Sequence, residues 1–266
     1  MNHLLREHAP LTDAAWALID GEARERLAPA LASRKLVDFE GPHGWTHSAT
    51  TLGRTVDIGG PEGLLRARQR RVLPLVELRA AFSVSREELG DAERGAVDVD
   101  LSGLDEAVAR IARAENVAVF HGWHEAGIVG IGDASPHGSR SLGDSYAAYP
   151  AVVAQAVETL LSAGVSGPYG LALGPDGYTG VVETTEHGGL VVFDHLRAIL
   201  GGPIVWAPGV RGAVVVSLRG GDFALDVGQD LSIGYEHHEA DAVHLYVEES
   251  FSFRAVTPDA AVALAV

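Results

Sequence analysis

Twelve histidines are the most versatile side chains of this sequence, because imidazole both binds metal ions and transfers protons near neutral pH. His121 and His124 stand three residues apart, but Gly122 between them favours a helix end, and the pattern supplies no acidic third ligand. A second group, His-His-Glu-Ala-Asp at 237–241, falls where a turn between two strands is expected. We interpret it as a solvated polar turn, and we expect no metal site.

Motifs for nucleophilic and cofactor chemistry are incomplete. The stretch 164–167, Gly-Val-Ser-Gly, has its second glycine one place too early for the Gly-x-Ser-x-Gly turn of hydrolases. The glycines at 127, 130 and 132 stand in the reverse order from a dinucleotide-binding fingerprint. The sequence also lacks cysteine, which excludes thiolate chemistry and disulfides. We therefore predict that the chain is not an enzyme, with a small soluble hydrolase as an open alternative.

Charge and hydropathy exclude two classes of partner. The 266 residues carry a formal charge of −16, which repels a phosphate backbone, so we expect no nucleic acid partner. No run approaches the roughly 20 apolar residues of a membrane span, and the first residues lack the apolar core of a secretory signal. At 47% hydrophobic residues the chain can bury a substantial core. We expect a cytoplasmic protein with no membrane partner.

The segment 212–256 carries the clearest strand pattern. Apolar residues alternate along 223–227 and 243–255, which is typical of half-buried strands, and Glu249 interrupts the second alternation. Gly220 and Gly221 follow the apolar run 213–218 and predict a tight hairpin, since glycine tolerates the positive φ angles that such a turn requires.

Two amphipathic helices are also predicted. Thr12 can cap a helix with an apolar face that recurs every three or four residues as far as Leu31, with Pro29 as a kink. Ser102, with Asp105 three residues later, begins the longest predicted helix, which continues to Gly122.

A long two-stranded arm is predicted at 44–75, because polar-rich stretches flank a turn signal at 58–63. An isolated ribbon is marginally stable in water, so we expect neighbouring subunits to pair with the arm. The returning strand places alternate arginines on one face, where they contact either solvent or carboxylates of a neighbouring subunit; we favour the carboxylates. The residues assigned to this contact are Ile58, Gly59, Gly60, Arg66, Arg68 and Arg70.

Short motifs along nearly the whole chain, in the same order, closely resemble the encapsulins, which are bacterial and archaeal shell proteins. The most similar are Leu-Arg-Gly-Gly-Asp-Phe at 218–223 and Gly-Gln-Asp-Leu-Ser-Ile-Gly-Tyr-Glu at 228–236. Further matches are Ala9-Pro10-Leu11-Thr12, Arg34-Lys35, Glu40-Gly41-Pro42, Gly44-Trp45, Asp91 to Gly95, Gly167-Pro168-Tyr169 and Trp206-Ala207-Pro208.

The resemblance implies the α+β fold of tailed-phage major capsid proteins, the HK97-like fold. A peripheral domain is then expected from residues 1–43, 76–131 and 223–266, the extended arm from 44–75, and an axial domain from 132–222. Alternating helices and strands over the last range agree with a compact α/β unit.

The function implied by the resemblance is structural. Sixty equivalent copies would assemble into an icosahedral (T=1) nanocompartment that encloses a cargo enzyme through its targeting peptide and admits small molecules through pores. The cargo class would be a dye-decolourising peroxidase, for oxidative stress, or a ferritin-like protein, for iron storage. A secreted bacteriocin-like role is the alternative that accompanies the hydrolase.

The resemblance implies two binding or transport sites, and at one further position this sequence differs from some members of the family. A cargo groove is expected from Leu27, Leu31, Arg34, Asp38, Ile233, Val243, Leu245 and Phe251, with packing of these residues within the subunit as the alternative. A fivefold pore is expected from Glu186, His187, Gly188, Gly189 and Leu190, with a plain surface loop as the alternative. Arg86 stands where some encapsulins place an aromatic residue against a flavin, so we expect no cofactor.

Overall fold

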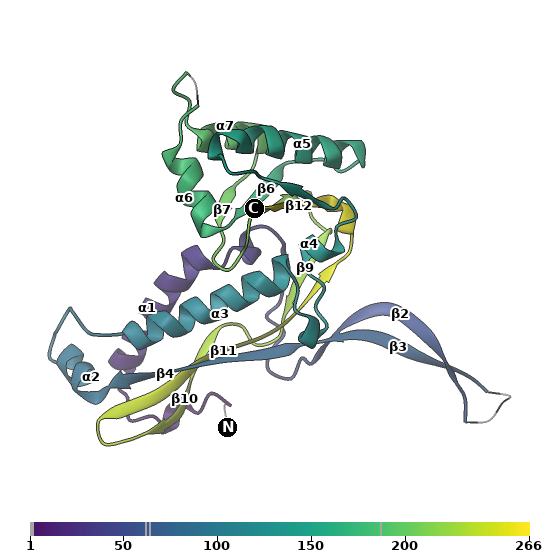
Figure 1. Ribbon diagram of the computed structural model, residues 1–266. Coiled ribbons are helices and arrows are strands. Elements are labelled where there is room, and N and C mark those ends of the chain that lie inside the picture. Colours follow the sequence, from purple (N-terminus) through teal and green to yellow (C-terminus); the bar gives the residue numbers. More distant parts are fainter. Residues whose placement is uncertain (1–2, 62, 64, 187) are drawn as a thin grey trace.

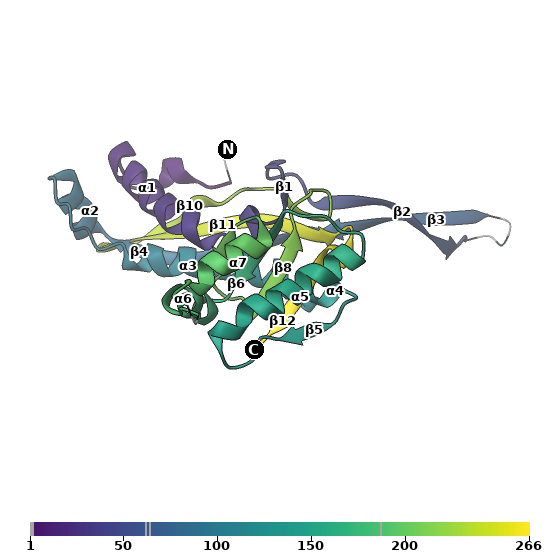
Figure 2. The ribbon, with the colours of Figure 1, turned by 90° about the horizontal axis from the view of Figure 1, so that it is seen from above.

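The computed structural model describes residues 3–61, 63, 65–186 and 188–266, which form a two-layered body and one long projecting arm (Figure 1). The lower layer of the body carries the N-terminal helix and a long mixed sheet, and the upper layer carries a second sheet under its own helices. The view from above shows the arm leaving the body to one side (Figure 2).

The lower layer packs two helices on one five-stranded sheet. The helices are α1 (Asp13–Ala30) and α3 (Ser102–Phe120). The strand order is β1-β9-β11-β10, with β4 also paired to β11. The strands are β1 (Asp38–Glu40), β4 (Val76–Ser85), β9 (Phe223–Val227), β10 (Ser232–His238) and β11 (Ala242–Ala255).

The helix starts only partly follow the sequence pattern. The Thr12 hydroxyl accepts a hydrogen bond from the Ala15 amide at 3.2 Å, which confirms the predicted cap of α1. Helix α3 does begin at Ser102, as predicted, but the capping box expected from Ser102 and Asp105 is absent: Ser102 is already helical, and its amide donates to Asp100 Oδ1 at 2.9 Å. A carboxylate is the better acceptor at this positively polarised helix end.

The upper layer is a five-stranded sheet in the order β5-β12-β8-β6-β7. Its strands are β5 (Ser139–Ser141), β6 (Tyr169–Leu173), β7 (Ile204–Trp206), β8 (Ala213–Ser217) and β12 (Ala261–Ala265). Helices α5 (Tyr149–Ser162) and α7 (Val192–Leu200) cover one face, and α6 (Pro175–Glu183) lies at the edge (Figures 1 and 2).

Two expectations about chain connections are wrong. Strand β12 pairs with β5 and β8 in the upper sheet, so the last part of 223–266 lies with the expected axial unit and not with the peripheral one. Gly220 and Gly221 do adopt positive φ angles of 84° and 79°, but the strands on either side belong to different sheets. The turn therefore connects the two layers and is not a hairpin.

The remaining elements are short. They are α2 (Arg86–Glu93), α4 (Ile131–Ala134) and 3-10 turns at Arg6–His8, Ser33–Lys35, His124–Ala126, Tyr146–Ala148 and Pro258–Ala260. Within the part of the chain that the structure describes, no helix has the length and apolar character needed to cross a membrane.

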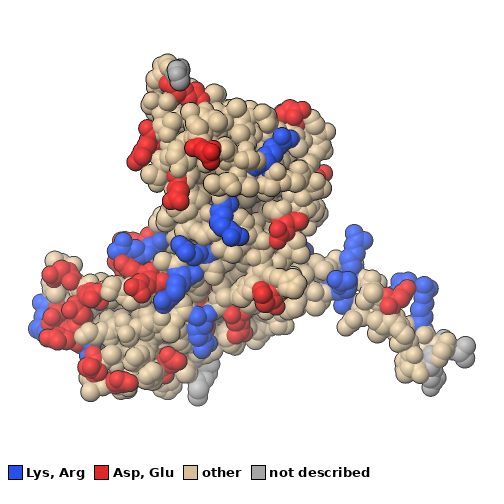
Figure 3. All heavy atoms as spheres, in the orientation of Figure 1, with Lys and Arg blue, Asp and Glu red and all other residues tan. Residues whose placement is uncertain are grey.

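The arm consists of β2 (Ala49–Gly59) and β3 (Arg66–Pro74), which form a two-stranded sheet of their own. Beyond its root nearly every described residue of the arm is exposed. Residues 49–74 carry five arginines against Asp57 and Glu62, a net charge of +3 on a chain whose total is −16. Figure 3 shows the basic side chains along the arm, whereas acidic ones predominate near α2 at the opposite end of the body.

Candidate functional site

A cavity of about 420 Å³ lies between α1 and the start of β10. Its size falls within the range of ordinary ligand pockets. One wall is α1, the second is the segment 230–233 at the start of β10, and the third is the N-terminal segment, where the Leu4 carbonyl accepts a hydrogen bond from the Tyr235 amide at 2.8 Å. The lining residues are Leu4, Arg6, Asp20, Ala23, Arg24, Leu27, Ala28, Leu31, Arg34, Asp230, Leu231, Ser232, Ile233 and Val247.

The cavity exists because α1 buries only one of its faces. Trp16, Ile19 and Ala23 pack into the core shared with α3 and the lower sheet. Farther along the helix Leu27 continues this face, while Ala28 is exposed at the rim. The helix then ends beside β10, which leaves an apolar floor with charged edges.

Four of the eight predicted groove residues line this cavity, namely Leu27, Leu31, Arg34 and Ile233. The other four do not, and their assignment to a groove wall is corrected by the structure. Val243 and Leu245 are fully buried between the sheet and the helices, and Phe251 is fully buried in the core that joins the layers. Asp38 lies at a separate cavity of about 220 Å³ and accepts a hydrogen bond from the Gly221 amide.

Several lining residues were missed by sequence reasoning. Ala28 is small, and Leu231 and Ser232 follow a glycine-containing segment whose strand character the alternation did not show. The N-terminal residue Leu4 precedes every predicted element. Ala28 stands three residues before Leu31, and this helical spacing is a signal that could have found it.

Arg34 occupies the cavity edge, but its guanidinium is already paired within the subunit. It makes ion pairs to Glu115 at 2.7 Å, Asp230 at 2.7 Å and Glu249 at 3.0 Å. The Glu115 and Glu249 side chains are fully buried, so removal of Arg34 would leave two uncompensated carboxyl groups in the core. Arg34 was predicted to line the cargo groove, and the structure shows that its charge is already engaged by carboxylates of its own subunit.

The pKa values of this cluster follow from burial and mutual charge. Burial raises the pKa of Glu249 well above 4.5, and the nearby Glu115 raises it further, while Arg34 acts in the opposite direction. Burial alone would lower the pKa of Arg34, but its contacts with Glu115 and Glu249 outweigh that effect and raise it. The Glu249 carboxyl group therefore holds its proton to a higher pH than a solvent-exposed glutamate does.

We expect the Glu249→Gln variant to gain stability over the wild type as the pH rises. Above pH 4.5 the unfolded wild type releases the Glu249 proton while the folded chain retains it, so wild-type stability falls through this window. The difference in the free energy of unfolding between the variant and the wild type should grow by about 1 kcal/mol per pH unit until Glu249 ionises in the folded chain. Thermal unfolding at pH 5 and pH 8 measures it, and an equal difference at both pH values would contradict the assignment.

The predicted pore loop connects α6 to α7 and stands out from the upper layer (Figure 1). The Glu186 amide donates to the Leu190 carbonyl at 2.8 Å, and the Glu186 carboxylate pairs with His195 at 3.0 Å. Gly188 and Gly189 adopt positive φ angles and are exposed, as is Leu190. His187 lies outside the described residues. The Glu186 carboxylate therefore has a partner within the subunit, which the sequence analysis did not predict.

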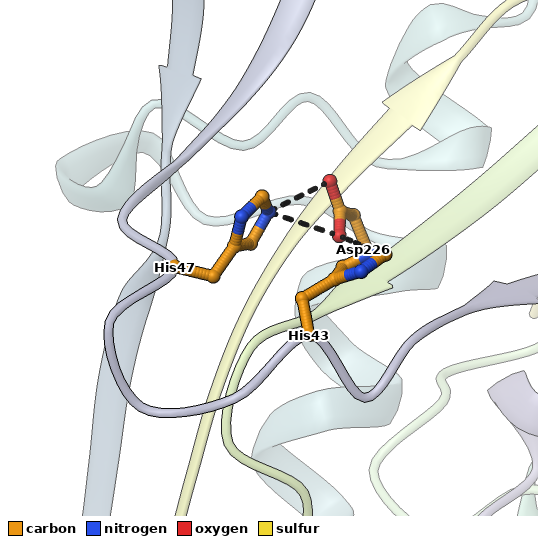
Figure 4. Close-up of side chains that lie close together, drawn as sticks. All are labelled: His43, His47 and Asp226. Atoms are coloured by element: carbon orange, nitrogen blue, oxygen red, sulfur yellow. Dashed lines mark hydrogen bonds and ion pairs between the residues drawn. The ribbon is translucent and has the colours of Figure 1, made fainter.

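The other histidines divide into isolated and clustered ones. His121 Nε2 accepts a hydrogen bond from the Arg211 amide at 2.9 Å, and burial, aided by the Arg211 charge, lowers the pKa of its imidazole. His237 stacks on His244 across the β10–β11 hairpin, with ring centroids 4.2 Å apart. Among the described residues two groups could each offer three ligand atoms to a metal ion: His43, His47 and Asp226 (Figure 4), and His237, Glu239 and His244.

Arg86 begins α2 and is exposed, and its guanidinium lies 3.4 Å from the Glu239 carbonyl. It supplies no aromatic ring at the position that the resemblance associates with a flavin.

The arm arginines are partly paired within the arm. Arg68 makes an ion pair with Asp57 at 2.9 Å, directly across from it on the neighbouring strand, and Arg66 lies 4.0 Å from the same carboxylate. Arg70 is exposed and has no carboxylate within 4.0 Å among the described residues. Ile58 is 47% exposed, and Gly59 and Gly60 adjoin the tip.

Comparison with known proteins assigns the fold to a family. The family model for an encapsulating protein for peroxidase matches residues 1–252. A type 1 encapsulin shell protein from Rhodospirillum rubrum is 47% identical over 270 residues, which is 99% of this chain and 96% of that protein. The chain belongs to the type 1 encapsulin family. Encapsulin shell proteins from Rhodococcus erythropolis and Mycobacterium tuberculosis are 42% and 41% identical, and each match covers at least 99% of both chains.

Solved structures confirm the capsid fold of this encapsulin. The virus-like particle from Pyrococcus furiosus superposes with a TM-score of 0.61 at 20% identity, covering 92% of this chain and 96% of that one. The capsid of an empty GTA particle gives 0.54 at 16% identity, covering 89% and 90%. The encapsulin is thus a shell subunit with an HK97-like fold and not an enzyme, and neither the hydrolase nor the bacteriocin alternative is favoured.

Proposed function

We propose that sixty copies of this chain form a closed icosahedral compartment that encloses a peroxidase and holds the peroxidase's targeting peptide in the cavity beside α1. The observation that carries the cargo proposal is the cavity itself, which has an apolar floor, a helix wall and a strand wall and lies beside the core that α1 shares with α3 and the lower sheet. The family description, an encapsulating protein for peroxidase, favours a peroxidase over a ferritin-like cargo.

The chemistry of the cavity suits a short extended peptide with alternate apolar side chains. Leu27, Leu31 and Ile233 offer the apolar contacts, and each peptide side chain that they bury would contribute about 1.5–3 kcal/mol before ordering costs. Two or three such contacts give weak binding at one site. An oligomeric cargo carries several peptides, and many identical cavities raise the overall affinity through effective concentration.

For small molecules we retain the proposal that the 186–190 loop surrounds the fivefold axis. Its glycines allow close approach of neighbouring copies, and Leu190 is 48% exposed beside them. Glu186 would present its carboxylate there already paired with His195. A structure of the assembled shell tests this proposal, because it shows where the loop lies relative to the fivefold axes.

Cargo recruitment is tested by co-expression of this chain with a peroxidase from the same genome. We expect peroxidase with its C-terminal tail to migrate with the shell on size-exclusion chromatography, and peroxidase without that tail to migrate alone. Full-length peroxidase found only in the free fraction, with intact shells present, would contradict the proposal. A fluorescent protein fused to the same tail serves as a control, because it carries no other peroxidase surface.

A further inference from the structure

His43, His47 and Asp226 come together where the arm joins the body. The two histidines belong to the loop between β1 and β2, and His47 stands two residues before β2 begins. Asp226 comes from β9 of the lower sheet, 179 residues away along the chain from His47. Figure 4 shows both imidazoles directed at the Asp226 carboxylate.

The distances among the ligand atoms suit one metal ion. His43 Nε2 lies 3.1 Å from Asp226 Oδ1, His47 Nε2 lies 3.4 Å from the same oxygen, and ligand atoms of the three residues lie within 4.8 Å of one another. A tetrahedral ion with bonds of about 2.0–2.1 Å separates its ligands by about 3.3 Å. The observed spacing therefore requires only small side-chain adjustments.

A second, independent observation concerns the burial of the Asp226 carboxylate. Asp226 is 4% exposed, and its Oδ1 is a buried atom that accepts no hydrogen bond among the described residues. Its other oxygen accepts from Thr50 Oγ1, which in turn lies 2.6 Å from Ser252 Oγ. The nitrogens nearest to Oδ1 are those of the two histidines, at 3.1 Å and 3.4 Å, and a buried carboxylate oxygen is costly unless a cation satisfies it.

The histidine loop is held in place by its backbone. The His43 amide donates to the Val227 carbonyl at 2.9 Å, and the Gly44 amide donates to the Gly228 carbonyl at 2.8 Å. The two imidazoles remain partly open to solvent, with side-chain exposures of 45% and 28%. Water therefore has access to the remaining coordination position.

We propose that His43, His47 and Asp226 bind a divalent transition-metal ion of the zinc class, with water as the fourth ligand. Two imidazoles and one carboxylate form a donor set that suits zinc better than magnesium or calcium, which prefer oxygen ligands alone. The Thr50 hydroxyl donates a hydrogen bond to Asp226 Oδ2, and hydrogen bonds of this kind commonly orient metal ligands.

Such an ion would fasten the arm to the body. It would link the loop that precedes β2 to β9 and so restrict the direction in which the arm leaves the subunit. Because the arm is otherwise a free two-stranded sheet, a fixed root would favour the geometry that the shell requires. The metal site does not depend on the identity of any cargo.

The test is cobalt binding by the full-length protein after treatment with a chelator. Cobalt(II) occupies zinc sites, and its visible absorption reports tetrahedral coordination. We expect one Co²⁺ per chain with tetrahedral absorption in the wild type, at least about tenfold weaker binding in Asp226→Asn, and displacement by Zn²⁺. Should Asp226→Asn misfold by circular dichroism, the His43→Gln/His47→Gln double variant, in two partly exposed residues, decides the question.

The matched control is His237→Gln, which disrupts the second histidine group at the β10–β11 hairpin. The His237→Gln variant should bind cobalt at the site formed by His43, His47 and Asp226 as the wild type does. Zinc should also raise the thermal midpoint of the wild type and of the control, but not that of Asp226→Asn. Cobalt absorption that survives Asp226→Asn and the double histidine variant, or that disappears in the control alone, would overturn the proposal, as would no binding by the wild type.

Discussion

Shortening the arm is expected to yield a folded subunit that no longer closes a shell. Thr51 and Val72 are register partners across β2 and β3, so residues 52–71 can be replaced by a two-residue Asn-Gly turn without disturbing the root. The two core clusters contain no residue from the excised segment among those described, so the body should keep its fold. Closure should fail because the exposed arm strands have lost their contacts with neighbouring copies.

Size-exclusion chromatography and negative-stain microscopy measure this result, and circular dichroism verifies the fold. We expect complete loss of closed particles and a shift to species of subunit size, 27.9 kDa before the excision. A full-length control carries Val56→Thr, a substitution of similar shape at a residue that is 40% exposed on the arm, and should assemble normally. Closed particles from the shortened chain would show that the arm is dispensable.

The Ala28→Glu variant is expected to form intact shells that are nearly empty of cargo. Ala28 is exposed and lines the cavity, so a glutamate there fits the helix but places a charge over the apolar floor. Loss of about 1.4 kcal/mol per site reduces binding about tenfold, and several peptides per cargo multiply the loss. The ratio of peroxidase to shell protein in purified particles should therefore fall at least about tenfold.

The control for that experiment is Ala14→Glu, which introduces the same charge on the same helix. Ala14 is exposed and does not line the cavity, and it lies about 21 Å from Ala28 along the helix axis. Cargo content should be unchanged in the control. Wild-type cargo content in Ala28→Glu would place the peptide elsewhere, and loss of shells would show that Ala28 serves assembly.

Local patterns in the sequence predicted the elements well. The Thr12 cap and the spacing of its apolar residues indicated α1, and the 58–63 turn signal indicated the arm, because both depend on residues close together in the chain. The alternation along 243–255 indicated β11. It could not reveal what covers the apolar face, so Val243 and Leu245 were assigned to a groove although α1 and α3 bury them.

Contacts between distant segments were beyond single-sequence reasoning. Glu249 interrupted the alternation of β11, and the structure shows the reason: it faces inward to Arg34, 215 residues away along the chain. Asp226 likewise alternates with the apolar residues of β9, a position typical of a polar side chain that faces solvent. In the structure it is buried beneath two histidines. The pairing of β12 with β8 in the upper sheet could not be predicted, because no local sequence pattern identifies the partner of a strand.

The most direct test of the shell assignment is the mass of the purified, unmodified particle by mass photometry or sedimentation velocity. Sixty copies of a 27.9 kDa chain predict an empty particle of about 1.7 MDa, with heavier species where cargo is enclosed. A single species at the mass of a monomer or dimer, under conditions where the chain is folded, would contradict the assignment of this protein as a shell subunit.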